Sequence, residues 1–290
     1  MKNLMKCLTA MSVCFASCQQ GNLVNPDDSS LPSSHNMREA AMPTTPKFYQ
    51  LVKHGGSTLT YSPDGLLEKV TFENESRSNF PTYKVYTYNA NSIVSKKYSN
   101  NKLEEVITYL LDPNTGNCYE SQHKAYSVSG QIQTKAKEST YAYFYNIKGQ
   151  LMMRENKHNP KDYTLLNYDT VWNLINVTTY GDAGNGAAKV VAESNLSYNQ
   201  PTGDPLLLNL LPINCEVANL PDAYLRIFGK PTKYLVKMIT EKGALGGRYF
   251  SYSMNADGYP TARQMYNLSG GDLTQTVNYD YLVTNIGLSL

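Results

Sequence analysis

The chain has 290 residues, with 26 basic and 24 acidic side chains and a formal net charge of +2 at pH 7. Without an excess or a cluster of Lys and Arg, this composition excludes binding to nucleic acid through a basic surface and gives no support for binding to anionic lipid headgroups. Two of the basic residues, Lys2 and Lys6, lie within the first 17 positions, so the remainder carries 24 basic and 24 acidic residues.

Residues 1–17 have the pattern of an export signal. Lys2 and Lys6 precede a short apolar run from Cys7 to Ala16. The run is about ten residues long, whereas a helix that crosses a bilayer needs about 20. The sequence therefore predicts a signal peptide over residues 1–17 rather than a membrane-spanning helix.

The predicted signal ends beside a cysteine. The tetrapeptide from Phe15 to Cys18 resembles the bacterial lipobox, with Phe15 where Leu is usual. This resemblance implies that Cys18 carries fatty acid such as palmitate and anchors the mature chain, since each buried CH₂ group contributes about 0.8 kcal/mol. We therefore expect a lipoprotein of the cell envelope, held at the outer membrane on either the periplasmic or the surface face. The alternative is an ordinary secretory signal in which Cys18 is incidental.

Residues 18–46 differ in composition from the rest of the chain. They are rich in Ser, Pro, Asn and Asp and have no sustained apolar period, which predicts that a disordered tether follows Cys18. From Lys47 onward, alternation with a period of two predominates. Residues 47–290 are therefore predicted to form a single β domain.

A short phrase recurs five times in this domain. It consists of a Tyr, a Gly or a substitute four positions later, and an aliphatic residue two positions beyond. A Tyr that ends one strand, a polar turn and an aliphatic residue that opens the next are typical of a β-hairpin. Tandem hairpins predict an all-β antiparallel meander, curled or closed like a barrel. The copies are Tyr61/Gly65/Leu67, Tyr88/Ser92/Val94, Tyr126/Gly130/Ile132, Tyr145/Gly149/Leu151 and Tyr168/Trp172/Leu174.

Alternation within segments indicates which side chains face inward. Between Leu273 and Val283, mostly apolar residues alternate with polar ones, which predicts a strand with one buried face. The segment Tyr141–Tyr145 has aromatic residues on both faces, including Phe144, and we predict it to be buried on both sides. At roughly 10–12 residues per strand and turn, the domain accommodates about 14–18 strands.

The segment near 204–231 departs from the hairpin pattern. Its apolar run is interrupted by Pro212 and Pro221, and residues 222–228 have the composition of a short helix that ends at Gly229. We predict a short Pro-rich, partly helical insertion that covers a sheet edge or plugs one end of the sheet.

Two stretches carry a resemblance to known proteins. The stretch Tyr145–Leu151 resembles the tyrosine-aspartate repeats of large bacterial shell-forming proteins. With the lipobox and the stretch Phe228–Val236, the chain is similar to anchored bacterial lipoproteins classed as a domain of unknown function with a porin-like fold. The similarity covers residues 48–285. It implies a large antiparallel meander, curled or closed like a barrel, and it implies no activity.

Residues that carry chemistry are scattered along the chain. His35, His54, His123 and His158 have no metal-ligand spacing, and we expect them at the surface. No nucleophile elbow and no phosphate-binding loop occurs in the sequence. We therefore assign no catalytic residue, no metal ligand and no cofactor.

Two cysteines, Cys118 and Cys215, follow the predicted lipid attachment site. In an oxidising envelope compartment they are a candidate disulfide. The alternative is a pair of buried free thiols, and the spacing of the two residues leaves both states open.

The predicted anchor, the tether and the 24 Tyr residues, without a catalytic motif, favour a non-enzymatic envelope protein. Because Tyr rings stack on sugars or line apolar cavities, we expect its concave face to bind or scaffold a glycan or an apolar ligand. The alternative is a glycan- or peptide-active envelope hydrolase; a glycosidase would need two carboxylates about 5–10 Å apart in one cleft. A third interpretation, an integral outer-membrane barrel, is disfavoured by outward-facing polar residues such as Lys69 and Asp280.

Overall fold

The computed structural model describes residues 47–73, 81–129, 132–184, 186–199, 216–242 and 246–285. The predicted signal peptide, Cys18, the tether, residues 204–215 of the predicted insertion and Cys215 lie outside these ranges. Within the described ranges, no helix has both the length and the apolar character needed to cross a membrane.

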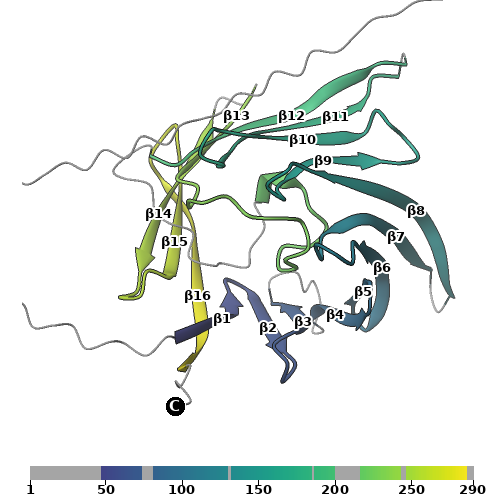
Figure 1. The fold of residues 1–290 in the computed structure, drawn as a ribbon, viewed down its shortest axis with the longest axis horizontal. Helices are drawn as coiled ribbons and strands as arrows, with labels where there is room; N and C mark the ends of the chain where they lie inside the picture. The colour runs from purple at the N-terminus through teal and green to yellow at the C-terminus, as the bar shows by residue number, and fades with distance from the viewer. Residues whose placement is uncertain are drawn as a thin grey trace, which may run out of the picture. The chain divides into compact units, whose positions relative to one another are not determined.

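Sixteen antiparallel strands form a closed barrel (Figure 1). Each strand pairs with the strands before and after it in the sequence, and β1 pairs with β16 to close the ring. This arrangement confirms the predicted all-β meander of hairpins. The strands are β1 Lys47–His54, β2 Ser57–Tyr61, β3 Leu67–Phe72, β4 Thr82–Asn89, β5 Ser92–Ser99, β6 Lys102–Leu111, β7 Cys118–Ser129, β8 Ile132–Tyr145, β9 Leu151–Asn156, β10 Tyr163–Tyr168, β11 Leu174–Asp182, β12 Ala188–Ser197, β13 Met238–Glu241, β14 Gly247–Met254, β15 Pro260–Asn267 and β16 Leu273–Asn285.

Period-two alternation sorts side chains between the interior and the outer surface of the barrel. In β16, Val277 and Tyr279 are buried, while the intervening Asn278 is exposed, as the alternation predicts. The prediction is wrong toward the ends of the strand, where Leu273 and Val283 on the same face are exposed. In β8, Tyr143 is 4% exposed but Phe144 is 45% exposed. The prediction that this strand is buried on both sides is therefore wrong, because Phe144 lies on the outer face of the wall.

The hairpin phrase is confirmed where it joins β2 to β3, β8 to β9 and β10 to β11. In each hairpin the Tyr pairs with the aliphatic residue across the turn, next to a β-bulge. The Gly position has a positive φ, 78° at Gly65, 79° at Gly149 and 72° at Trp172. Glycine adopts this conformation without steric cost, whereas Trp172 adopts it against the preference of a bulky side chain.

The remaining two copies of the phrase differ from the prediction. The copy at Tyr88 is a hairpin, but Ile93 rather than Val94 lies opposite the Tyr. Tyr126 lies inside β7, opposite Lys135, and the turn after it falls outside the described residues. Spacing alone therefore did not determine which residue faces the Tyr.

A ladder of tyrosine hydrogen bonds explains why Tyr recurs. Near the end of an even-numbered strand, the phenol donates to a backbone carbonyl in or just before the preceding strand. Each bond ties a barrel strand to its neighbour and contributes about 1 kcal/mol net. The members of this tyrosine ladder are Tyr61 to Leu51 (2.7 Å), Tyr88 to Leu67 (3.0 Å), Tyr145 to Cys118 (2.6 Å), Tyr168 to Leu151 (2.9 Å), Tyr198 to Leu174 (2.7 Å), Tyr252 to Val236 (2.7 Å) and Tyr281 to Pro260 (2.8 Å).

The connection from β12 to β13 enters the barrel. Residues 216–237, which we call the plug, run inside the ring of strands (Figure 1). The Cys118 amide donates to the carbonyl of Ile227 at 2.7 Å, and Gly229 forms a β-bridge with Gln150. The buried Phe228 ring packs against Tyr143, with 5.2 Å between ring centroids. These contacts place the described part of the predicted insertion in the core of the barrel.

The predicted helix over residues 222–228 is wrong. Within the described chain the plug has one helical turn, the 3₁₀ turn Glu216–Ala218. The carboxylate of Asp222 instead accepts the amides of Tyr224 and Leu225, at 3.0 and 3.3 Å. An Asp side chain that bonds to nearby amides competes with helix formation, so this segment is irregular and follows the barrel wall.

Candidate functional site

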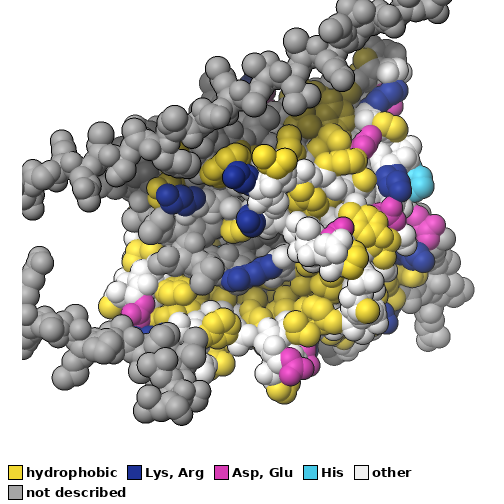
Figure 2. Space-filling view, viewed as in Figure 1, with side chains coloured by type: hydrophobic (Ala, Val, Ile, Leu, Met, Phe, Trp, Pro, Cys, Tyr) yellow, Lys and Arg dark blue, Asp and Glu magenta, His cyan; other side chains and the backbone are white. Residues whose placement is uncertain are grey.

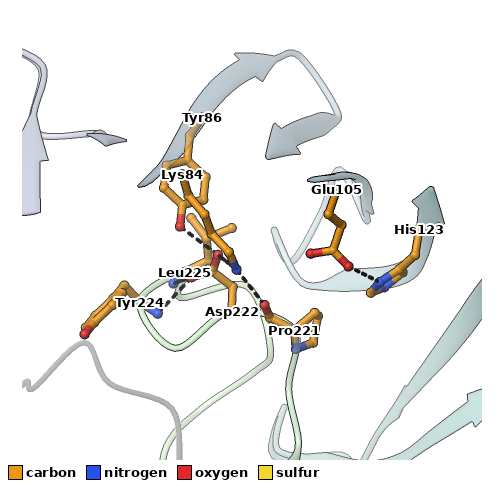
Figure 3. A network of polar contacts seen from close by, with 8 residues as sticks. All are labelled: Lys84, Tyr86, Glu105, His123, Pro221, Asp222, Tyr224 and Leu225. Atoms are coloured by element: carbon orange, nitrogen blue, oxygen red, sulfur yellow. Dashed lines mark hydrogen bonds and ion pairs between the residues drawn. The ribbon is translucent and has the colours of Figure 1, made fainter. Parts of the chain in front are cut away.

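A buried ion pair holds the plug to β4 (Figure 3). Lys84 Nζ lies 3.4 Å from Asp222 Oδ2 and donates to the Pro221 carbonyl at 3.0 Å. Tyr86 donates to the same carboxylate oxygen at 2.7 Å. The Asp222 side chain is 1% exposed, so these partners replace the hydrogen bonds that the carboxylate would form with water. Burial, together with Asp222, holds the pKa of Tyr86 well above its ordinary value.

A second polar chain runs along the inner face of β6 and β7. The Ser121 hydroxyl lies 2.8 Å from His123 Nε2. His123 Nδ1 lies 3.7 Å from Glu105, and Figure 3 shows this pair. The order serine, histidine, carboxylate is that of a nucleophilic triad. However, Ser121 is 0% exposed, and its hydroxyl is also within 2.8 Å of the Tyr143 hydroxyl. The neighbouring His123 ring lowers the pKa of Glu105.

A cavity of about 130 Å³ separates part of the plug from the barrel wall. Most of its lining is apolar. The wall contributes residues from β1, β9, β10, β11, β13, β14, β15 and β16. The plug contributes Glu216, Ala218, Leu220 and most of the segment from Phe228 to Val236. Apolar lining residues include Leu151, Leu166, Leu174, Phe228, Ile239 and Phe250.

Charged and polar side chains gather at one part of this cavity. Glu216 of the plug accepts from Arg263 of β15, with Nη2 and Oε1 2.6 Å apart. His54, the last residue of β1, lies within 3.0 Å of the Tyr224 hydroxyl through Nδ1, and its ring packs on Tyr279. We call His54, Glu216 and Arg263 the polar end of the cavity.

Two atoms at the polar end have no hydrogen-bond partner among the described residues. They are His54 Nε2 and Arg263 Nε, and both are buried. Burial, reinforced by the positive charge of Arg263, lowers the pKa of His54 to about 4. His54 is therefore neutral at physiological pH, and the Arg263 charge is balanced by Glu216.

The structure corrects two predictions about histidine and leaves the lipid site untested. His158 is exposed, as expected, but His54 and His123 point into the barrel. For His123 a signal was available, because it alternates with the buried Ser121 on β7. Cys18 and His35 lie outside the described residues. In the described part of the chain, no cluster of three or more His, Cys, Asp or Glu side chains could hold a metal ion.

Cys118 opens β7, is buried, and forms no disulfide with any described residue. Its Sγ donates to the Glu120 carbonyl at 3.1 Å, and burial raises the pKa of the thiol to about 12. Its candidate partner, Cys215, lies outside the described residues, so the disulfide remains a prediction.

Comparison with known proteins identifies the fold. No family model matches the sequence, and no curated protein matches it. The barrel resembles the crystal structure of a porin-like protein from Bacteroides uniformis, with a TM-score of 0.54 and 16% identity over 83% of this chain and 98% of the other. The fold is porin-like. A second porin-like protein, from Bacteroides vulgatus, has 14% identity and a TM-score of 0.48 over 80% of this chain and 98% of its own.

The likeness to the Bacteroides uniformis barrel bears out the porin-like fold that the family resemblance implied. Because no family model matches, membership in the lipoprotein family and the kinship of the hairpins with tyrosine-aspartate repeats remain predictions. At 16% identity the likeness concerns the fold and carries no residue roles.

Proposed function

We propose that this protein is a non-enzymatic, lipid-anchored envelope protein whose barrel binds an apolar ligand between the plug and the wall. The observation that carries the proposal is the cavity of about 130 Å³ with its predominantly apolar lining. An apolar cavity of about 150 Å³ inside a protein stays dry and takes up benzene. The lining favours an apolar ligand over a glycan, because the many hydroxyls of a sugar would lack partners against Leu and Phe side chains.

Charged side chains on the outer wall support anchoring over insertion of the barrel into lipid. On β7, Glu120, Gln122 and Lys124 alternate on the outer face, and Lys157 reaches Glu120 at 2.8 Å. Charged side chains on a lipid-facing wall cost about 2–4 kcal/mol each for Lys or Arg at the bilayer midplane. Together with the predicted Cys18 anchor, these outward charges support a barrel that stands in water beside the membrane. Figure 2 looks into the ring of strands and shows charged side chains interspersed among hydrophobic ones at that end of the barrel.

The hydrolase alternative has one observation in its favour, the series Ser121, His123 and Glu105. Its geometry does not serve a nucleophilic attack, because Ser121 is fully buried and shares its hydroxyl with Tyr143. The interior carboxylates Glu105, Asp222 and Glu216 each have a basic partner. We therefore interpret the serine–histidine–glutamate series as a hydrogen-bond chain that joins neighbouring strands.

A cavity-filling substitution tests the proposal. Ala218 is buried and lines the cavity, so Ala218→Leu should occupy part of the space and abolish binding of toluene. Overpacking costs about 1–3 kcal/mol, which circular dichroism and thermal unfolding would monitor. Binding is measured by saturation-transfer NMR on the purified full chain.

The matched control is Ala142→Leu, which adds the same atoms on β8 at a position that does not line the cavity. We expect this variant to bind toluene as the unmodified chain does. Toluene binding that survives Ala218→Leu in a folded protein would place the binding elsewhere and refute the proposal.

A further inference from the structure

We infer that the ligand is uncharged and carries one hydrogen-bond acceptor, such as a carbonyl or ether oxygen, which Arg263 and His54 hold at the polar end of the cavity. This inference rests on the proposed apolar-ligand function and specifies its ligand class. The supporting observation is a pair of buried nitrogens, Arg263 Nε and His54 Nε2, that lack partners among the described residues and lie at a predominantly apolar cavity.

Arg263 supplies the first donor. Its Nη2 is engaged by Glu216 at 2.6 Å, and its guanidinium lies 5.0 Å from the centroid of Phe250. The Nε–H has no acceptor on the protein within the described residues, although it is buried. A buried donor without an acceptor destabilises a protein by about 1–3 kcal/mol. A ligand oxygen in the cavity would satisfy it.

His54 supplies the second donor. Its Nδ1 lies 3.0 Å from the Tyr224 hydroxyl, and its Nε2 has no partner within the described chain. When Tyr224 donates to Nδ1, the single proton of the neutral imidazole resides on Nε2. Nε2–H then donates into the cavity that His54 and Arg263 both line.

The charges around the polar end select against an ionised ligand. The groups that face His54 are Arg263, Glu216, Tyr224 and Tyr279. The Arg263 charge is balanced by Glu216, and burial keeps His54 neutral by lowering its pKa to about 4. At the polar end, a carboxylate ligand would therefore lie beside two charges that already balance each other, and removing it from water is costly. The other cation that lines the cavity, Lys230, is exposed to solvent. A neutral ketone, aldehyde, ester or ether avoids this cost.

Three probes of similar shape separate the possibilities: toluene, benzaldehyde and benzoate. Toluene has no acceptor, benzaldehyde adds one carbonyl oxygen, and benzoate adds a charge. Each is titrated into the purified full chain at pH 7 with NMR detection. Since a hydrogen bond to a charged group contributes about 1.5–3 kcal/mol, we expect benzaldehyde to bind at least about tenfold tighter than toluene. Benzoate should bind more weakly than either.

Two variants test whether the preference for benzaldehyde over toluene comes from the polar end of the cavity. Arg263→Lys keeps the charge opposite Glu216 but removes the Nε–H, so benzaldehyde and toluene should then bind about equally. Arg154 is the matched control, because its Nε is also buried without a partner among the described residues. Its Nη1 donates to the Asn219 carbonyl of the plug at 3.0 Å, and Arg154 does not line the cavity. Arg154→Lys should preserve the benzaldehyde preference. Retained toluene binding shows that each variant is folded.

The outcomes distinguish this inference from the function on which it rests. If neither toluene nor benzaldehyde binds, the proposed apolar-ligand function and the inference both fail. If toluene binds and benzaldehyde has no advantage, or benzoate binds most tightly, the inference fails while the cavity remains a binding site. A benzaldehyde preference that persists in Arg263→Lys also overturns it. If Arg263→Lys does not fold, the relative affinities of toluene, benzaldehyde and benzoate for the unmodified chain still test the inference.

Discussion

At the scale of single residues, Gly229 shows how closely the plug approaches the wall. Its φ is +81°, and a Cβ placed there would lie 2.5 Å from the Gly149 carbonyl oxygen and 2.9 Å from the Tyr145 ring. A backbone oxygen cannot move aside as the end of a flexible side chain can. Glycine at this position thus allows the plug and the turn after β8 to meet as a β-bridge between Gly229 and Gln150.

We predict that Gly229→Ala lowers the free energy of unfolding by about 2–4 kcal/mol, through backbone strain and displacement of the plug. Gly116→Ala is the matched control, because Gly116 also has a positive φ, +72°, but a Cβ there would meet nothing described within 4 Å. It should cost only about 1 kcal/mol. Urea unfolding of both variants measures the difference. Equal losses of unfolding free energy in the two variants would mean that the close approach of Gly229 to the Gly149 carbonyl does not contribute to the cost.

A second residue-scale prediction concerns pH. His54 has a pKa of about 4 in the folded protein, against 6.5 ordinarily. In the unfolded chain it binds a proton below pH 6.5, so its contribution to stability is present above pH 6.5 and is lost as the pH falls toward 4. A shift of this size corresponds to about 3 kcal/mol.

The free energy of unfolding should therefore decrease between pH 6.5 and 4, and His54→Gln should flatten this decrease. Urea unfolding at a series of pH values provides the measurement. His158→Gln, at an exposed position, is the control and should not change how the free energy of unfolding depends on pH. An unchanged slope in His54→Gln would show that His54 is not the titrating group.

At the scale of elements, the tyrosine ladder joins neighbouring strands at seven places around the barrel, with no member between β5 and β6 among the described residues. The outward residues of the same strands take no part in it: Tyr163 of β10 stacks on Tyr180 of β11, with ring centroids 4.4 Å apart. Tyr168, at the other end of β10, donates inward to the Leu151 carbonyl at 2.9 Å. β10 therefore carries two tyrosines with different roles. Tyr168 uses its hydroxyl to bond to the neighbouring strand, whereas Tyr163 uses its ring to stack on Tyr180.

We expect Tyr168→Phe to destabilise the barrel by about 1–2 kcal/mol, because the Leu151 carbonyl loses a hydrogen-bond donor while the ring still packs. Tyr163→Phe keeps the stacked pair and should change stability by less than about 0.5 kcal/mol. Thermal unfolding of both variants compares them directly. A Tyr163→Phe loss as large as that of Tyr168→Phe would argue against the ladder.

At the scale of the whole molecule, the wall of the barrel and its contents have different roles. The hairpins close a ring through β1 and β16, and the plug fills much of the space inside. The outer face of the wall carries charged side chains such as Glu120 and Lys124, with exposed apolar side chains on other strands. Under the proposed function, association with a membrane depends on the acyl chains predicted at Cys18 rather than on the barrel.

Cys18→Ala should abolish palmitate incorporation and release the protein from the membrane fraction. Metabolic labelling with palmitate, followed by fractionation of cells, tests this expectation. The unmodified chain is the control and should be labelled and sediment with membranes. A Cys18→Ala chain that still requires detergent for extraction would favour an integral barrel instead.

Much of the wall was predictable because its signals are local. The phrase from Tyr145 to Leu151 specifies a turn with a positive φ and a Tyr opposite an aliphatic residue, and neither feature needs distant partners. Alternation in β16 likewise assigned Val277 and Tyr279 to the interior, because side chains of a strand alternate between its faces.

The contents of the barrel were decided by the tertiary structure. Residues 222–228 have helical composition, yet contacts with Lys84, Tyr86 and Gln150, all remote in the sequence, hold the plug against the wall. His54 and Arg263 come from opposite ends of the domain and meet only because β1 closes onto β16 and β15 lies next to it. Hairpin geometry is encoded over a few adjacent residues, whereas the polar end of the cavity exists only once the ring has closed.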